Sequence, residues 1–331
     1  MNRRPPRPKR GALPTALHPE RDEYNAKVEK SQADGPDVKH LRQTLFLIPL
    51  LAGLWACSPS IEPASTATTI PPTPTQTATP LPPTPTPTAT PLGCLTQPGH
   101  VEQGIVEETK PPQEYLIYLP PCYEEMPDLR YPVLYLLHGQ TYTSDQWVRL
   151  GTVAVMDRLF VEKEVSPFII VFPDDRYWNV EAGPGFGQRL VDHLMPYIDQ
   201  NYRSLADREH RAIGGMSRGA GWALRLGLRR WELFGTLGLH SLAAFGDDRP
   251  FLRNWLEAIP PEKWPEIFID TGENDSELGF NLLFENTLTQ LGIPHEWHLY
   301  PGAHDEAYWE AHAEEYLRWY AGVWAGQAEE Q

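Results

Sequence analysis

A serine between two glycines is the residue of this sequence best suited to chemistry. Ser217 lies in the segment GMSRG (residues 215–219), after an apolar run at 210–217 and before a helical pattern. Between a strand and a helix, this G-x-S-x-G spacing is typical of a nucleophile elbow, a tight turn that lifts the serine hydroxyl clear of the sheet. Glycine and serine are also common in ordinary turns, so the motif is decisive only together with the rest of the chain.

Candidate partners for this serine follow in the order serine, acid, histidine, which strand–helix architectures of this kind use. The segment DTGEND (270–275) supplies the carboxylate, and spacing alone does not choose between Asp275 and Glu273. His304 follows the next apolar run, in YPGAHD. It would accept the serine proton and return it to the leaving group, while the carboxylate fixes its tautomer and stabilises the imidazolium.

The residues after the run YPVLYLL are candidates for stabilising negative charge. Gly139 lets the backbone turn so that the next amide, that of Gln140, can point toward the nucleophile. The amides of Gln140 and Arg218 would then form an oxyanion hole. We interpret His138 as structural and bonded to nearby backbone, because it precedes the elbow and ends a different strand from His304.

Aromatic residues and one further histidine are expected near the mouth of a substrate cleft. Aromatic walls suit a sugar or aryl ester, although packing is the default reading for such side chains. No histidine and carboxylate cluster has metal-ligand spacing, and the glycines of EAGPGFG (181–187) lack a nucleotide-binding arrangement. We therefore expect no metal and no cofactor. The cleft candidates are Tyr142, Trp147, Trp178 and His240, with Ser241 and Trp309 beside them.

Apolar, β-rich runs alternate with helical patterns from about residue 94 to residue 331. This alternation predicts an α/β fold with a mostly parallel sheet covered by helices on both faces. In such sheets functional groups gather beyond the carboxyl ends of the strands, where Ser217 and His304 lie. Strands are predicted at 113–120, 131–139, 168–175, 210–217, 235–241, 266–275 and 295–302, and helices at about 152–164, 187–202, after Ser217, 277–291 and 305–324.

The N-terminal region differs in charge from the rest of the chain. Residues 1–43 hold ten Lys and Arg against six Asp and Glu, with few apolar residues, and are predicted to be disordered. Subtracting that +4 from the formal −16 of the chain leaves about −20 for residues 44–331. Such an acidic body repels nucleic acid and anionic membrane surfaces, so we expect no nucleic-acid partner.

The segment TLFLIPLLAGLWAC (44–57) is typical of a secretory signal. Its apolar stretch is short for a membrane span, and its end resembles a lipoprotein signal in which Cys57 would be lipidated. The alternative is an uncleaved signal anchor with an incidental cysteine. The Pro- and Thr-rich residues 58–93 predict an extended linker. Together these segments predict an exported, cell-surface or extracellular protein that meets the membrane only through an N-terminal lipid or signal anchor.

Two cysteines remain near the start of the predicted folded domain, 94–331. In an exported protein, Cys94 and Cys122 are expected to form a disulfide. Two buried free thiols are the alternative. A disulfide here would close a loop at the entrance to the domain and stabilise it mainly by restricting the unfolded chain.

Several segments between about residues 113 and 320 resemble the putative esterase family of α/β-hydrolases. That family includes esterase D-like S-formylglutathione hydrolases, feruloyl and acetylxylan esterases, enterochelin esterases and mycolyltransferases. The resemblance implies an α/β-hydrolase fold at 94–331, and Arg218 and Ala220 depart from residues frequent in the family. The segments that carry it are YPVLYLLHG, VFPDD, LVDHLMPYIDQNYR, HRAIGGMSRGA, DTGENDSEL and YPGAHDEAYW.

Carried over to this chain, the resemblance assigns Ser217 as nucleophile and His304 as base. Its D-x-G-x-x-D pattern favours Asp275 over Glu273 as the acid, and Gln140 and Arg218 supply the oxyanion hole. The expected function is that of an exported serine carboxylesterase, acting through an acyl-enzyme on a small-molecule or polysaccharide ester such as an acetyl, feruloyl or siderophore ester. The alternatives are an acyltransferase of the mycolyltransferase type and a non-catalytic surface-binding module.

Overall fold

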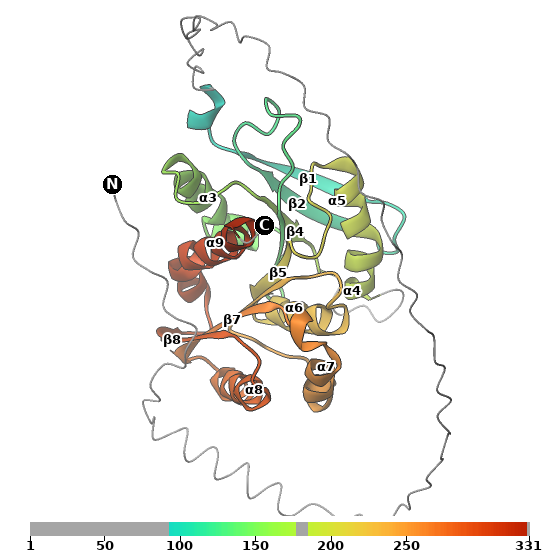
Figure 1. Ribbon diagram of the computed structural model, residues 1–331, viewed down its shortest axis with the longest axis vertical. Coiled ribbons are helices and arrows are strands. Elements are labelled where there is room, and N and C mark those ends of the chain that lie inside the picture. Colours follow the sequence, from blue (N-terminus) through green and yellow to red (C-terminus); the bar gives the residue numbers. More distant parts are fainter. Residues whose placement is uncertain (1–92, 177–184, 330–331) are drawn as a thin grey trace, which may run out of the picture. The chain divides into compact units, whose positions relative to one another are not determined.

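The computed structural model describes residues 93–176 and 185–329, which belong to one compact unit, Ala89–Gln331 (Figure 1). The predicted segments 1–43 and 44–57, with Cys57, lie outside the described residues. The same is true of the cleft candidate Trp178 and of the whole predicted linker except Gly93. In the described ranges, no helix combines the length and the apolar character that crossing a membrane requires.

The described chain is organised around one eight-stranded sheet with the order β1-β2-β4-β3-β5-β6-β7-β8. Neighbouring strands from β4 to β8 run parallel, whereas β1 pairs antiparallel with β2 and β2 pairs antiparallel with β4. The α/β fold with a mostly parallel sheet is thus confirmed. The strands are β1 (His100–Val106), β2 (Gln113–Leu119), β3 (Val133–Leu137), β4 (Ile169–Pro173), β5 (Arg211–Met216), β6 (Thr236–His240), β7 (Glu266–Asn274) and β8 (Glu296–Ala303).

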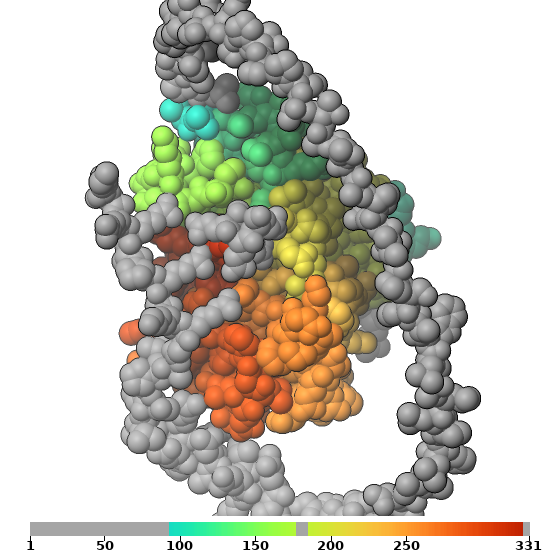
Figure 2. Space-filling model, viewed as in Figure 1, coloured from blue at the N-terminus to red at the C-terminus, as the bar shows by residue number. Residues whose placement is uncertain are grey.

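Helices cover both faces of this sheet. Figure 1 shows α3 and α9 on one side of the strands and the α5 and α6 region on the other, and Figure 2 shows the α7 and α8 residues (orange) as part of one continuous surface. The helices are α2 (Gln146–Arg149), α3 (Thr152–Val161), α4 (Phe186–Arg189), α5 (Met195–Asn201), α6 (Arg218–Arg229), α7 (Leu252–Ala258), α8 (Leu278–Leu291) and α9 (Glu306–Glu329), with the shorter turns η1 (Gly93–Thr96), η2 (Leu190–Leu194), η3 (Arg249–Phe251) and η4 (Pro261–Lys263).

The continuous apolar runs of the central strands follow from this two-sided covering. Side chains of a strand alternate between its faces, so a strand buried on both faces needs apolar residues at every position. In β3, Val133 and Tyr135 join the core beneath α5 and α6, whereas Leu134 and Leu136 join the core beneath α3 and α9. All five residues of β3 are buried.

Two kinds of element were not predicted from the sequence. Strand β1 is mostly exposed, and Val106 is its one buried residue, so its sequence lacks an apolar alternation and its position depends on pairing with β2. The short helices α2 and α7 fall in segments assigned to no element. The predicted helix 187–202 begins one residue earlier, at Phe186, and runs through α4, the π-helical turn η2 and α5.

The predicted pairing of Cys94 with Cys122 is confirmed, since a disulfide joins η1 to the turn that follows β2. Replacing both cysteines with serine should lower the free energy of unfolding by about 3.5 kcal/mol, because the closed loop spans a sequence separation of 28. Urea denaturation of the two proteins measures this difference. Peptide mapping without reduction supplies the control: separate Cys94 and Cys122 peptides would contradict the pairing.

Candidate active site

The chain forms a strained turn at Ser217, between the end of β5 and the start of α6. Ser217 has φ 54° and ψ −119°, a conformation that L-residues adopt only when the surroundings enforce it. The turn is enforced by close packing, since a Cβ on Gly219 would lie 2.4 Å from the Leu137 carbonyl oxygen and one on Gly215 would lie 2.5 Å from it. Only glycine fits at these two positions, as the motif predicts.

The three predicted triad residues lie within hydrogen-bonding distance of one another. His304 Nε2 is 2.8 Å from Ser217 Oγ, and His304 Nδ1 is 2.9 Å and 3.0 Å from the two carboxylate oxygens of Asp275. With Nδ1–H donating to the carboxylate, Nε2 carries the lone pair that can receive the serine proton. The rival acid Glu273 is exposed on β7. Asp275, not Glu273, therefore contacts the histidine.

Asp275 is held as a carboxylate by several donors. The Glu277 amide donates to its Oδ1 at 2.7 Å, and the Trp309 indole donates at 3.0 Å to Ser241 Oγ, whose hydroxyl bonds the carboxylate in turn. Burial by itself raises the pKa of Asp275, but the hydrogen bonds from His304, the Glu277 amide and Ser241 outweigh it and keep the pKa below its ordinary value. Asp275 is thus ionised at neutral pH.

The position of His304 follows from the end of β8 and the start of α9. Asp305 caps α9, with its carboxylate accepting the Tyr308 amide at 3.0 Å. The Trp309 ring meets the imidazole edge-on, with ring centroids 5.1 Å apart. Trp309 therefore contacts His304 directly and Asp275 through Ser241.

The predicted oxyanion-hole residues lie on two segments that pack against each other, the elbow and the loop after β3. Arg218 is the first residue of α6, where backbone amides point out of the helix toward a developing negative charge. Gly139 N–H donates to Gln146 Oε1 at 2.8 Å, while the amide of Gln140 has no acceptor among the residues that the structure describes. The loop meets the elbow closely: a Cβ on Gly219 would come 2.7 Å from the His138 carbonyl oxygen.

The predicted cleft residues divide between surface and interior. Tyr142 is 39% exposed and stacks with the Arg149 guanidinium, 5.7 Å from its ring centroid. Trp147 and His240 are not cleft residues in this structure, because they are 1% and 0% exposed. The Trp147 indole donates to the Leu137 carbonyl at 2.9 Å, and His240 lies 2.7 Å from the buried carboxylate of Asp270.

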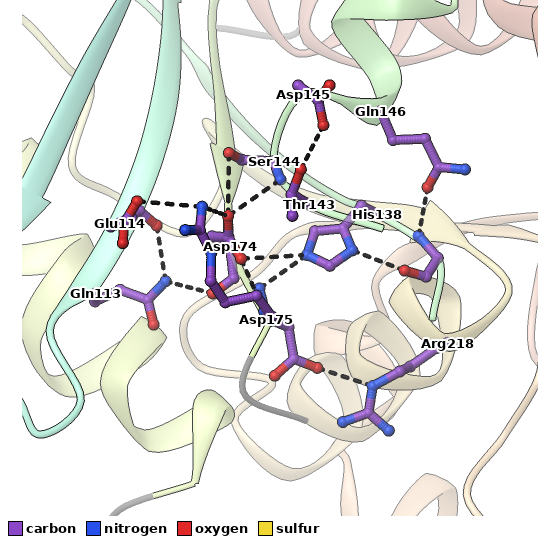
Figure 3. A network of polar contacts seen from close by, with 12 residues as sticks. Gln113, Glu114, His138, Thr143, Ser144, Asp145, Gln146, Asp174, Asp175 and Arg218 are labelled. Atoms are coloured by element: carbon purple, nitrogen blue, oxygen red, sulfur yellow. Dashed lines mark hydrogen bonds and ion pairs between the residues drawn. The ribbon is translucent and has the colours of Figure 1, made fainter. Parts of the chain in front are cut away.

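A network at the end of β4 also belongs to the site and was not predicted as part of it. Asp175 binds the Arg218 guanidinium at 2.9 Å, and its amide donates to His138 (Figure 3). Its carboxylate also accepts from the Trp222 indole at 2.8 Å. The sequence signal was the VFPDD segment, which marked a family resemblance without a role. In residues 93–176 and 185–329, no three His, Cys, Asp or Glu side chains are grouped so that they could hold a metal ion.

Fold and site together define an α/β-hydrolase whose serine lies in a nucleophile elbow with histidine and aspartate beside it. The chain belongs to the putative esterase family, whose model matches residues 107–320. This membership assigns the domain to the carboxylic ester hydrolases, as the sequence predicted.

The chain is similar to two curated bacterial proteins. An endo-1,4-beta-xylanase/feruloyl esterase of Xylanibacter ruminicola is 31% identical over 186 residues, which is 53% of this chain and 24% of that protein. An esterase of Mycobacterium tuberculosis is 27% identical over 226 residues, 53% of this chain and 48% of the relative. The chain thus matches about a quarter and about half of the lengths of these relatives.

Solved structures share the fold over most of their length. A ferulic acid esterase has a TM-score of 0.63 and 25% identity, covering 69% of this chain and 99% of that structure. An S-formylglutathione hydrolase of Staphylococcus aureus has a TM-score of 0.54 and 19% identity, covering 68% and 98%. The second likeness concerns the fold alone.

Proposed function

We propose that this protein is a serine carboxylic ester hydrolase that acts through an acyl-enzyme on Ser217, with His304 as general acid and base and Asp275 as its orienting carboxylate. The observation that carries the proposal is the continuous chain of hydrogen-bonding distances, 2.8 Å from Ser217 to His304 and 2.9 Å from His304 to Asp275. A serine in an elbow with no catalytic role would not need an imidazole on its hydroxyl and a buried carboxylate behind that imidazole.

In the acylation step, Ser217 Oγ attacks the ester carbonyl carbon while its proton passes to His304 Nε2. The carbonyl oxygen becomes an oxyanion that accepts hydrogen bonds from the amides of Gln140 and Arg218. The C–O bond to the alcohol then breaks, and His304 gives its proton to the leaving alkoxide. The acyl group remains on Ser217 as an ester.

In the deacylation step, His304 Nε2 takes a proton from water as the water oxygen attacks the acyl carbon. The second tetrahedral oxyanion collapses, the bond to Ser217 Oγ breaks, and the proton returns to Oγ. Asp275 remains ionised throughout and balances the positive charge on His304, which its lowered pKa permits. A carbohydrate hydroxyl in place of water would make the same site a transferase.

The substrate class that we propose is a hydroxycinnamoyl ester of a carbohydrate. The support comes from the relatives whose names include feruloyl or ferulic acid esterase, at 31% and 25% identity. Exposed Tyr142 offers an aromatic surface for such a substrate.

An ester panel tests this function. Purified protein should hydrolyse a feruloylated arabinoxylan oligosaccharide with a kcat/KM at least about tenfold above that for acetylated xylan, since pocket contacts discriminate acyl groups by that order. A siderophore lactone and a long-chain acyl ester complete the panel. Equal or better turnover of any of these would contradict the substrate class, transfer to an added sugar would indicate the acyltransferase, and binding without turnover would indicate a non-catalytic module.

We also propose that the enzyme is exported and held by residues 44–57, with a lipid on Cys57 or an uncleaved signal anchor, and that residues 58–93 form a linker to the domain. The disulfide between Cys94 and Cys122 supports an oxidising compartment. Peptide mapping of protein from its native cells tests this location, because thiols kept reduced there would contradict export.

A further inference from the structure

The orientation of the proposed oxyanion donor is set by a peptide group whose other end is held. The amide N–H of Gln140 and the carbonyl of Gly139 belong to the same peptide unit. In a trans peptide these two groups point in opposite directions, so fixing the carbonyl also fixes the N–H. His138 Nδ1 lies 2.7 Å from the Gly139 carbonyl oxygen (Figure 3).

The two groups that hydrogen-bond the His138 ring define a single tautomer, and the Asp174 carboxylate, 4.0 Å from Nε2, lies beyond hydrogen-bonding distance. The Gly139 carbonyl can only accept, so Nδ1 carries the proton, and the Asp175 amide can only donate, so Nε2 carries the lone pair at 2.8 Å. His138 is 4% exposed, and burial lowers its pKa, which favours this neutral form. A proton on Nε2 would face the Asp175 N–H directly and break the arrangement.

The same loop is held on its other side. Gly139 N–H donates to Gln146 Oε1 at 2.8 Å, and the Gln146 amide donates to Glu306 at 3.0 Å. Gln146 is completely buried. The peptide before Gly139 and the peptide after it are therefore both fixed by side chains, which leaves the Gln140 N–H with one direction available.

We propose that His138 is a positioning residue of the active site: as the neutral Nδ1–H tautomer it holds the Gly139 carbonyl and thereby aims the Gln140 amide at the oxyanion. The proposal rests on the proposed function, since it concerns how that site stabilises its transition state. His138 is not placed to act as the base, because both of its ring nitrogens bind backbone groups and His304 already contacts the serine hydroxyl. Its contribution is made in the transition state, where the oxyanion forms.

A matched pair of substitutions separates the two hydrogen bonds of His138. His138→Asn places an amide nitrogen near the position of Nδ1 and can still donate to the Gly139 carbonyl. His138→Gln places an amide oxygen near the position of Nε2 and can still accept from the Asp175 N–H, but it leaves the Gly139 carbonyl with the long Tyr142 amide contact of 3.4 Å in place of the imidazole donor. Each variant therefore keeps one of the two bonds and loses the other.

The expected result is a difference in kcat between these variants. His138→Gln should lower kcat by about 100-fold or more with KM changed less than about threefold, as for loss of one oxyanion-hole donor, whereas His138→Asn should keep kcat within about tenfold of wild type. The midpoint temperature of thermal unfolding should fall by similar amounts in both variants. Equal losses of kcat in the two variants, or a loss confined to KM, would overturn the proposal.

Two further measurements keep the proposal open to refutation. Activity of the wild type that disappears in Ser217→Ala shows that the proposed function stands, so failure of the His138 inference can be told from failure of the function. If His138→Gln does not fold, the imidazole nitrogens of ¹⁵N-histidine-labelled wild type decide the matter, with the His138 signal identified by its loss in His138→Asn. A protonated Nδ1 is expected, and a protonated Nε2 would overturn the inference.

Discussion

Replacing Ser217 with alanine should reduce kcat for ester hydrolysis by roughly 10⁵-fold or more, the order of loss expected when the nucleophile of a complete triad is removed. In the proposed mechanism, the hydroxyl that lies 2.8 Å from His304 attacks the ester and carries the acyl group, and alanine offers no replacement. Residual hydrolysis would come only from the oxyanion hole and substrate binding.

The fold should tolerate this change. Alanine retains the Cβ of serine, so the cost of holding φ at 54° stays the same, and only the hydrogen bond with His304 is lost. Thermal unfolding should confirm a folded protein. Ser166→Ala is the matched control, since Ser166 is exposed and precedes β4 at the opposite end of the parallel strands, and it should leave kcat within about twofold. Full activity in Ser217→Ala would refute the acyl-enzyme mechanism.

The parts of the fold that the sequence predicts well are those governed by local periodicity. The runs that form β3 and β4 are apolar at every position because both faces of these strands are buried. Both ends of every predicted strand lie within two residues of the observed ends. The proximity of the candidate triad residues could be predicted for the same reason. Once the strands are known, Ser217 and His304 must meet at the carboxyl edge of one sheet.

The burial of Trp147 and His240 could not be predicted from the periodicity of the sequence. Both follow or approach strand ends, as cleft residues do, yet the Trp147 indole turns inward to the Leu137 carbonyl and His240 pairs with Asp270 across β6 and β7. Burial of a polar ring depends on partners that are distant in sequence: 10 and 30 residues away in these cases. Periodicity carries no information about them.

The hydrogen bonds that hold the loop after β3 could not be predicted for the same reason. His138 was correctly interpreted as structural, but its partner Asp175 is 37 residues away, and the link from Gln146 to Glu306 spans 160 residues. Tertiary hydrogen bonds of this kind fix the functional geometry after the strands have formed. They become visible only when the fold brings the strand ends together.

Replacing Asp275 with asparagine should lower kcat by about 10³- to 10⁴-fold, the second largest effect expected. An asparagine amide can donate to His304 Nδ1, which would place the imidazole proton on Nε2 and leave no lone pair to receive the Ser217 proton. The loss of charge also removes the group that stabilises the imidazolium. Steady-state kinetics on the preferred ester measure the effect, with KM expected to change little because Asp275 is buried and does not reach substrate.

The matched control is Glu273→Gln, which removes the neighbouring carboxylate on the same turn. Glu273 is exposed, so this variant should keep kcat within about twofold and unfold at the same temperature. Asp275→Asn should also unfold more easily at neutral pH, because a carboxylate whose pKa is lowered by folding stabilises the folded state. That stabilisation is complete above about pH 4 and is lost as the pH falls further, so the stability difference between wild type and Asp275→Asn should shrink in acid. A larger loss of kcat in Glu273→Gln than in Asp275→Asn would assign the acid to Glu273 and require a rearranged turn after β7.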